Sequence, residues 1–184
     1  LSLRSEVGKG TVFRVVLPLA EPAPSSARAE PIGELRPRGV LLVEDDALVR
    51  EATLAVFEAR GFWVEAVSSA DRVLDTLARL EAEGRRPDLV VTDHRLPGAL
   101  TGEDLVRKLH AAPDPLPVVL MSGDVEAPFL RQAPPPGVTV LRKPVSAEAL
   151  LEAALERVAV RERASAAQEA RGLYAGTRRA RAGT

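Results

Sequence analysis

The stretch Val90-Val91-Thr92-Asp93-His94-Arg95-Leu96-Pro97-Gly98 decides the fold of this chain. It is a short apolar run that ends at Asp93, and Pro97-Gly98 then forces a turn. The run predicts a buried strand that carries Asp93 at its carboxyl end. Because ligands of open α/β sheets bind beyond the carboxyl ends of the parallel strands, Asp93 is a candidate for chemistry. Taken alone, Asp93 is better interpreted as a residue that caps the turn after the strand.

Strands alternate with helices on both sides of this stretch. Further apolar runs predict strands at residues 40–43, 62–67, 116–121 and 138–142. Amphipathic segments between them predict helices, and this alternation is typical of βαβ units in a parallel sheet. Right-handed crossovers would give an α/β doubly wound, five-stranded parallel sheet with the strand order 2-1-3-4-5, counted along this region, and with helices on both faces.

The helices are predicted with particular caps and buried faces. Asp46, Ser69 and Ser146 are the expected N-caps of the first, second and last helix. A short helix at residues 125–133 is poorly supported, because it contains a proline. The positions expected to face the core on the first helix are Val49, Ala52, Val56 and Ala59. Those on the last helix are Leu151, Leu155 and Val158.

The chain divides into four segments by composition. Residues 1–20 alternate around a glycine-rich turn and predict a β-hairpin. Residues 21–37 are rich in Pro, Ala, Ser and charge, which is typical of a linker. Residues 38–160 form the alternating α/β domain. Residues 161–184 are rich in Ala and Arg, and we interpret them as an extension of the last helix that frays into disorder, with solvated Arg side chains.

The composition excludes several classes of function. A formal net charge of −1 argues against a dedicated nucleic-acid-binding protein. The absence of Cys excludes disulfides, thiolate chemistry and Cys-based zinc sites, and it fits a reducing, cytoplasmic compartment. No apolar run approaches the roughly 20 residues that a membrane span requires. Because the chain begins at Leu1 rather than Met, we interpret it as a fragment of a longer protein.

Polar side chains of particular types follow four of the predicted strands. Glu44 and Asp45 follow the first strand, Asp93 ends the third, Ser122 ends the fourth and Lys143 follows the fifth. In the proposed strand order their positions converge at one edge of the sheet. Clustered carboxylates repel one another unless a cation neutralises them, and carboxylate and carbonyl oxygens suit Mg²⁺. With a lysine and a hydroxyl aimed at the same point, this site could hold a phosphoryl group on Asp93.

Residues 38–160 resemble a response-regulator receiver domain. The motifs LLVEDD (41–46), VVTDHRLPG (90–98), VVLMSG (118–123) and LRKP (141–144) occur in the order of that family, and together they are specific although each alone is weak. The resemblance implies a flavodoxin-like fold. It also implies that the domain takes a phosphoryl group in a two-component phosphorelay.

The resemblance assigns roles to individual residues. Asp93 matches the phosphoacceptor. Asp45 matches a direct Mg²⁺ ligand, Glu44 a ligand acting through water, and the backbone carbonyl of Arg95 would complete the metal shell. The catalytic positions that remain are Ser122, whose hydroxyl follows the phosphoryl group, and the family lysine, Lys143. Val140 stands where the family often has an aromatic switch residue, so a switch of that kind is not expected here.

The first residues of the chain resemble a different domain. Strands flank Gly8-Lys9-Gly10, and the sequence GKGTVF followed by Leu17-Pro18-Leu19 resembles the last hairpin of the ATP-binding domain of sensor histidine kinases. The apolar residues Val12, Val15 and Leu17 would need a cover that this segment lacks. The order of kinase-like hairpin, linker and receiver therefore suggests the C-terminal receiver of a hybrid histidine kinase, although the fragment cannot be expected to bind ATP.

The resemblance also implies partners. A histidine-kinase phosphodonor domain, in the same chain or in trans, would supply the phosphate, and a histidine phosphotransfer protein could receive it. A dimer could form through the fourth helix, the fifth strand and the last helix. Neither nucleic acid nor membrane is expected as a partner of this segment.

Two other functions stay open. The domain could be a protein-interaction module that depends little on phosphorylation. It could also be a Mg²⁺-dependent phosphatase with an aspartyl-phosphate intermediate, but such enzymes place a second Asp two residues after the nucleophile, where this chain has Arg95. His94 and His110, the two histidines of the chain, are given no role.

Overall fold

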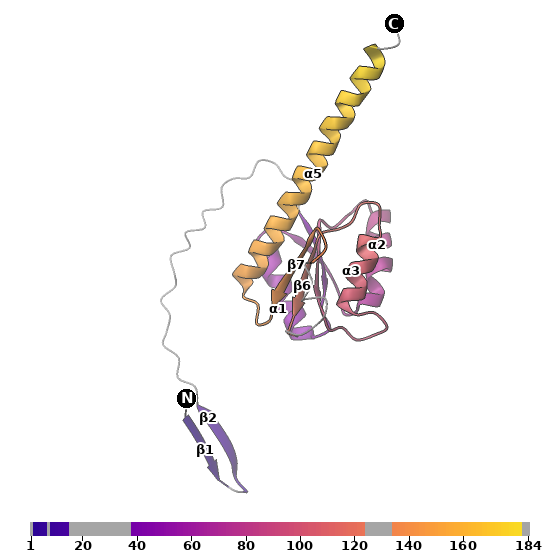
Figure 1. Cartoon of the computed structure of the whole chain (residues 1–184). Helices are drawn as coiled ribbons and strands as arrows, with labels where there is room; N and C mark the ends of the chain where they lie inside the picture. Colours follow the sequence, from indigo (N-terminus) through magenta and orange to yellow (C-terminus); the bar gives the residue numbers. More distant parts are fainter. Residues whose placement is uncertain (1, 7, 15–37, 124–133, 182–184) are drawn as a thin grey trace. The chain divides into compact units, whose positions relative to one another are not determined.

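The computed structural model describes residues 2–6, 8–14, 38–123 and 134–181 (Figure 1). The chain splits into two compact units, Leu1–Leu35 and Arg36–Thr184, and each is described by itself. The expected linker at 21–37 and the expected helix at 125–133 lie outside the described residues.

The first unit contains the predicted hairpin. Strands β1 (Ser2–Glu6) and β2 (Gly10–Arg14) pair antiparallel. The turn between them needs glycine, because Gly8 and Gly10 have φ of +79° and +103°, which L side chains rarely adopt. Val12 is 64% exposed within its own unit, as expected for a hairpin that lacks a cover.

The second unit is built on a five-stranded parallel sheet with the order β4-β3-β5-β6-β7. This confirms the predicted order 2-1-3-4-5 and the doubly wound, flavodoxin-like topology. The three inner strands β3, β5 and β6 are buried almost throughout, as parallel strands usually are, whereas the edge strands β4 and β7 are mostly half-buried. The strands are β3 (Gly39–Val43), β4 (Trp63–Val67), β5 (Leu89–Asp93), β6 (Val118–Ser122) and β7 (Val138–Arg142).

Helices cover both faces of this sheet. Helices α1 (Ala47–Glu58) and α5 (Ala147–Arg181) lie on one face, and α2 (Val73–Ala82) and α3 (Gly102–His110) lie on the other (Figure 1). A short 3₁₀ turn, η1 (Ala70–Arg72), leads into α2. Alternate residues of the strands feed two separate cores, so that Leu42 packs with α1 and α5 while Leu41 packs with α2 and α3.

The predicted inward face of α1 is wrong at most of its positions. Val49 is 41% exposed, and Ala52 and Ala59 are also exposed. Phe57 is fully buried instead and meets Phe62 edge to face, with ring centroids 5.5 Å apart. The largest apolar side chain of the helix therefore sets its rotation, because it removes the most apolar area from water.

The predicted caps are confirmed at two of three helices. The Asp46 carboxylate accepts from the backbone N–H groups of Leu48 and Val49, and the Ser146 hydroxyl accepts from that of Ala149. The Ser69 side chain makes no capping hydrogen bond. The chain enters α2 through η1 instead, where the Arg72 N–H bonds to the Ser69 carbonyl at 3.3 Å.

Helix α5 continues well past residue 160. It runs to Arg181 and extends beyond the sheet (Figure 1). The expectation that the Arg side chains of this segment are solvated is wrong for Arg161, whose Nη2 lies 2.9 Å from Asp114 Oδ2 and whose side chain is 18% exposed. Glu162 pairs with Arg38 at 3.3 Å. In the described part of the chain, no helix combines the length and apolar character that a membrane span needs.

Candidate functional site

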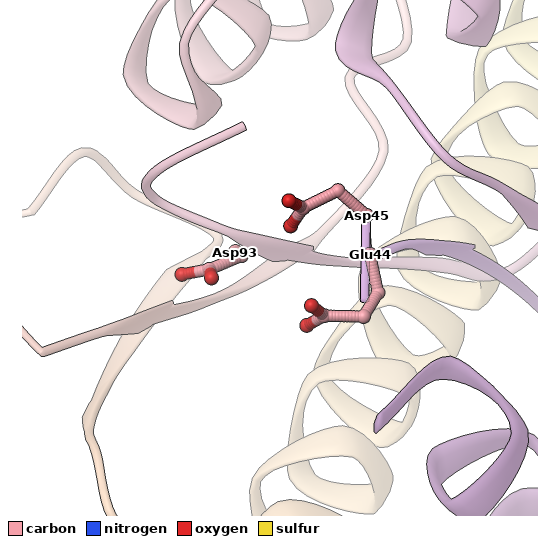
Figure 2. A group of neighbouring side chains, drawn as sticks. All are labelled: Glu44, Asp45 and Asp93. Atoms are coloured by element: carbon pink, nitrogen blue, oxygen red, sulfur yellow. The ribbon is translucent and has the colours of Figure 1, made fainter. Parts of the chain in front are cut away.

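Three carboxylates meet at the carboxyl edge of the sheet. Glu44 and Asp45 follow β3, and Asp93 ends β5, which is its neighbour in the sheet. One carboxylate oxygen from each lies within 4.8 Å of the others, and the three side chains extend toward the same side of the edge (Figure 2). The sheet topology alone accounts for this grouping, because parallel neighbouring strands end at the same edge.

Lys143 places a cation in this cluster. It follows β7, and its Nζ lies 2.7 Å from Asp93 Oδ2 and 3.9 Å from Glu44 Oε2. Partial burial acts to lower the pKa of Lys143, but the hydrogen bond to Asp93 and the nearby acidic charges outweigh it and raise that pKa. Lys143 is therefore protonated at neutral pH and offsets part of the acidic charge.

Glu44 is the buried member of the cluster, at 2% exposure. Burial raises its pKa, partly opposed by the charge of Lys143. Its Oε1 accepts a hydrogen bond from the Asp46 N–H at 3.3 Å, whereas its buried Oε2 has no hydrogen-bond partner. A buried carboxylate oxygen without a hydrogen-bond partner destabilises the folded protein unless a cation binds it. The donor set of Glu44, Asp45 and Asp93 consists of hard oxygens, which fit a small divalent cation.

The other predicted site residues occupy the surrounding strands and loop. Ser122 is buried at the end of β6, one position beyond the residue that pairs with Asp93, and its carbonyl accepts from the Lys143 N–H at 2.8 Å. Arg95 lies in the exposed loop after β5. Val140 lies in β7, partly buried against the core that α2 and α3 cover. The structure thus groups Glu44, Asp45, Asp93 and Lys143 directly and sets Ser122 on the adjacent strand.

The structure also reveals residues around the site that the sequence did not identify. The Arg50 guanidinium donates to the backbone carbonyls of Glu44 and Asp45. Asp71 accepts from the Ala99 N–H at 3.2 Å and so holds the loop after Asp93. One signal was available for Arg50, since a cation is unfavourable near the N-terminus of a helix and its presence there requires a compensating contact.

The fold and this grouping of acidic residues with a lysine define a phosphoacceptor type of α/β domain. The family model of the response regulator receiver domain matches residues 40–155. The chain therefore belongs to the response regulator receiver domain family.

Individual relatives agree with this assignment. The chain is 31% identical over 140 residues to the sensor kinase CckA of Brucella abortus, covering 71% of this chain and 14% of that protein. A response regulator receiver protein from Sinorhizobium medicae superposes with a TM-score of 0.58 at 26% identity, covering 68% of this chain and 97% of that one. The receiver domain of the hybrid histidine kinase CckA gives a TM-score of 0.51 at 27% identity, covering 65% and 98%.

The chain spans only part of the longer proteins that it matches. It covers 14%, 25% and 57% of three curated relatives. Residues 40–155, which the family model matches, are the two-component signalling module of this chain.

Proposed function

We propose that Asp93 accepts a phosphoryl group from a phosphohistidine, as one step of a phosphorelay. The observation that carries this proposal is the contact of Lys143 with Asp93 inside the carboxylate cluster. A lysine at 2.7 Å from the acceptor oxygen is placed to bind an anion attached to that oxygen.

The transfer needs positioning and charge stabilisation more than covalent assistance. A carboxylate oxygen of Asp93 attacks the phosphorus as the phosphorus–nitrogen bond breaks, and the electron pair of that bond leaves with the imidazole. Lys143 exchanges its contact with the carboxylate for a contact with a phosphoryl oxygen. In this proposal the hydroxyl of Ser122, which ends the neighbouring strand, donates to a second phosphoryl oxygen.

Glu44, Asp45, Asp93 and the backbone carbonyl of Arg95 are the groups that would hold Mg²⁺. The buried Glu44 Oε2 without a hydrogen-bond partner supports this choice. When bound, Mg²⁺ supplies positive charge that offsets the repulsion between the carboxylates and the incoming phosphoryl oxygens.

The surface beside Lys143 suits a phosphohistidine carried on a helix. A cavity of about 340 Å³ lies between α1 and the start of α5, and its lining includes Val49, Val56 and Val145 next to Lys143. Leu48, at 78% exposure, extends the same apolar surface along α1. An amphipathic helix could bury these residues while its histidine reaches Asp93. The expected fourth-helix dimer face includes residues outside the described ranges, and it stays a prediction.

The parent protein in this proposal is a hybrid histidine kinase that contains this receiver. The similarity to the sensor kinase CckA supports the proposal, as does the antiparallel hairpin of β1 and β2. A cytoplasmic location follows from it, because the phosphohistidine donor forms where ATP is available.

The test is phosphorylation of the 184-residue chain with Mg²⁺ and acetyl phosphate. The expected product carries a single acid-stable, base-labile phosphate, which Asp93→Asn abolishes. Asp46→Asn is the matched control, because it removes a neighbouring carboxylate but keeps a residue that caps α1. Phosphate that persists in Asp93→Asn would contradict the proposal. Rapid release of inorganic phosphate would favour a phosphatase, and no labelling would favour an interaction module.

A further inference from the structure

The loop between β3 and α1 is held by a single arginine of α1. Arg50 Nη1 donates to the carbonyl oxygen of Glu44 at 2.8 Å and to that of Asp45 at 3.1 Å. Both acceptors belong to residues of the carboxylate cluster, so one guanidinium fixes the two successive peptide units from which two of the three carboxylates project.

Other contacts also hold this loop, among them the Asp46 N–H, which donates to Glu44 Oε1 at 3.3 Å. The Glu44 N–H bonds to the Val67 carbonyl at 3.1 Å, which fixes the start of the loop to β4. The Asp46 carboxylate caps α1 and fixes its end. Between these two points, Arg50 supplies the side-chain hydrogen bonds to the Glu44 and Asp45 carbonyls among the described residues.

The position of Arg50 is electrostatically unfavourable for the helix itself. It lies four residues after the Asp46 N-cap, near the positive end of the helix dipole, and the first turn of α1 contains no acidic residue. The two carbonyl acceptors offset that cost. Charge-assisted hydrogen bonds of this kind are stronger than those between neutral groups.

We propose that Arg50 is a positioning residue that holds the Glu44 and Asp45 carboxylates in the geometry that binds a divalent cation beside Asp93. This inference rests on the proposed phosphoacceptor site and adds to it a residue that touches neither phosphate nor metal. Removal of a group that orients metal ligands in this way typically weakens metal binding by about 10- to 100-fold.

The direction of the change in Mg²⁺ affinity distinguishes a positioning role of Arg50 from an effect of its charge alone. Arg50 is a cation near a cation site, so removing its charge alone should tighten Mg²⁺ binding. Removing the two carbonyl contacts should weaken it, because the carboxylates must then be ordered when the ion binds. Arg50→Gln makes both changes. Arg50→Lys keeps the charge but replaces the single guanidinium nitrogen, Nη1, that contacts both carbonyls with an ammonium on a differently shaped side chain.

The experiment measures Mg²⁺ affinity of the 184-residue chain by calorimetric titration. Arg50→Gln is expected to raise the Kd for Mg²⁺ by about tenfold, and Arg50→Lys by a smaller factor. Arg79→Gln is the matched control, because Arg79 makes only side-chain ion pairs, with Glu65 and Glu83, on the opposite face of the sheet. Thermal unfolding of each variant checks that it is folded at the assay temperature.

A second measurement needs no metal. Amide hydrogen exchange by NMR should be faster at Asp45 and Asp46 in metal-free Arg50→Gln than in the wild type, with unchanged rates in β5. An unchanged or lower Kd for Mg²⁺ in Arg50→Gln overturns the proposal, as does a wild type that binds no Mg²⁺. A wild type that binds Mg²⁺ but takes no phosphate on Asp93 overturns the proposed function and leaves the role of Arg50 in metal binding standing.

Discussion

A Cβ atom on Gly102 would lie 2.2 Å from the carbonyl oxygen of Asp93. The first turn of α3 therefore packs directly against the backbone of the proposed phosphoacceptor, closer than any side chain allows. The Gly102 N–H donates to the His94 carbonyl at 3.0 Å, which ties the same turn to the residue after Asp93. Gly102 is required by this close approach and not by an unusual backbone conformation.

We expect Gly102→Ala to lower the free energy of unfolding by about 1–3 kcal/mol, the usual cost of overpacking. Helix propensity alone gives the opposite sign, since Ala in place of Gly within a helix stabilises by about 0.5–1 kcal/mol. Urea unfolding measures the difference. Gly123→Ala is the control, because a Cβ there meets nothing within 4 Å. Equal stability of the two variants would contradict the close packing of α3 on β5.

The strands and their order were predictable because they follow from short-range pattern. Apolar runs that end in polar residues locate the buried strands, and the alternation with helices leaves few possible topologies. The site followed from the same pattern, since Glu44, Asp45, Asp93 and Lys143 all stand at strand ends that the topology brings to one edge.

The features that were not predicted depend on tertiary packing. The rotation of α1 follows from the fit of Phe57 against Phe62, which periodicity does not report. Arg50 and Gly102 act through backbone carbonyls of other segments, so the sequence does not name the groups that they contact, although a cation near the start of α1 was a signal for Arg50. The ion pair of Arg161 with Asp114 joins residues 47 positions apart, and a local reading of a basic tail misses it.

Replacement of Lys143 should separate metal binding from phosphoryl transfer. Lys143→Gln removes a cation from a cluster that a divalent cation would share. We expect the Kd for Mg²⁺ to fall by roughly threefold to tenfold, which corresponds to the ~1 kcal/mol of a partly exposed ion pair. Phosphorylation by acetyl phosphate should become slower, because the developing phosphoryl charge loses its fixed lysine.

Calorimetry and a single-turnover phosphorylation assay measure these two quantities on the same Lys143→Gln sample. Lys108→Gln serves as the control, since Lys108 lies on the exposed side of α3. Weaker Mg²⁺ binding in Lys143→Gln would show that Lys143 orders the carboxylates more than it competes with the metal.

The exposed apolar residues of α1 should affect the rate of phosphoryl transfer from a protein donor but not from a small-molecule donor. Leu48→Ser and Val49→Ser remove apolar surface beside the cavity at Lys143 without touching the buried core. We expect transfer from a phosphorylated histidine kinase or phosphotransfer protein to slow by about tenfold for each, the effect of losing ~1.4 kcal/mol of contact. The rate with acetyl phosphate should not change.

Leu74→Ser tests the same loss of exposed apolar surface on α2, on the other face of the sheet. The rates compared are those of phosphoryl transfer to Asp93 from each donor, under conditions where the donor protein is not saturating. An equal loss of transfer in Leu74→Ser would place the donor surface elsewhere.

His110 should make the stability of the domain depend on pH. It ends α3, and burial lowers its pKa below the ordinary value of 6.5. Among the described residues, its buried Nε2 has no hydrogen-bond partner that would offset the cost of burying the charged form. Asp114, Arg157 and Arg161 line the same cavity, so one carboxylate and two guanidinium groups surround it.

The sign follows from linkage. Between the folded-state pKa and 6.5, the unfolded chain binds more protons at His110 than the folded chain does, so the free energy of unfolding falls as the pH falls through this interval. The contribution of His110 is complete above the unfolded-state value and is lost progressively below it. Glu44, whose pKa is raised by burial, acts in the opposite direction.

The difference between wild type and His110→Gln therefore isolates His110. Urea unfolding from about pH 8 down to about pH 5 should give a steeper loss of stability for the wild type than for His110→Gln. His94→Gln changes the other histidine of the chain and is the control. It should lose stability with falling pH as steeply as the wild type does, because it keeps His110. Parallel curves for wild type and His110→Gln would mean that His110 is solvated enough in the folded state to titrate as it does in the unfolded chain.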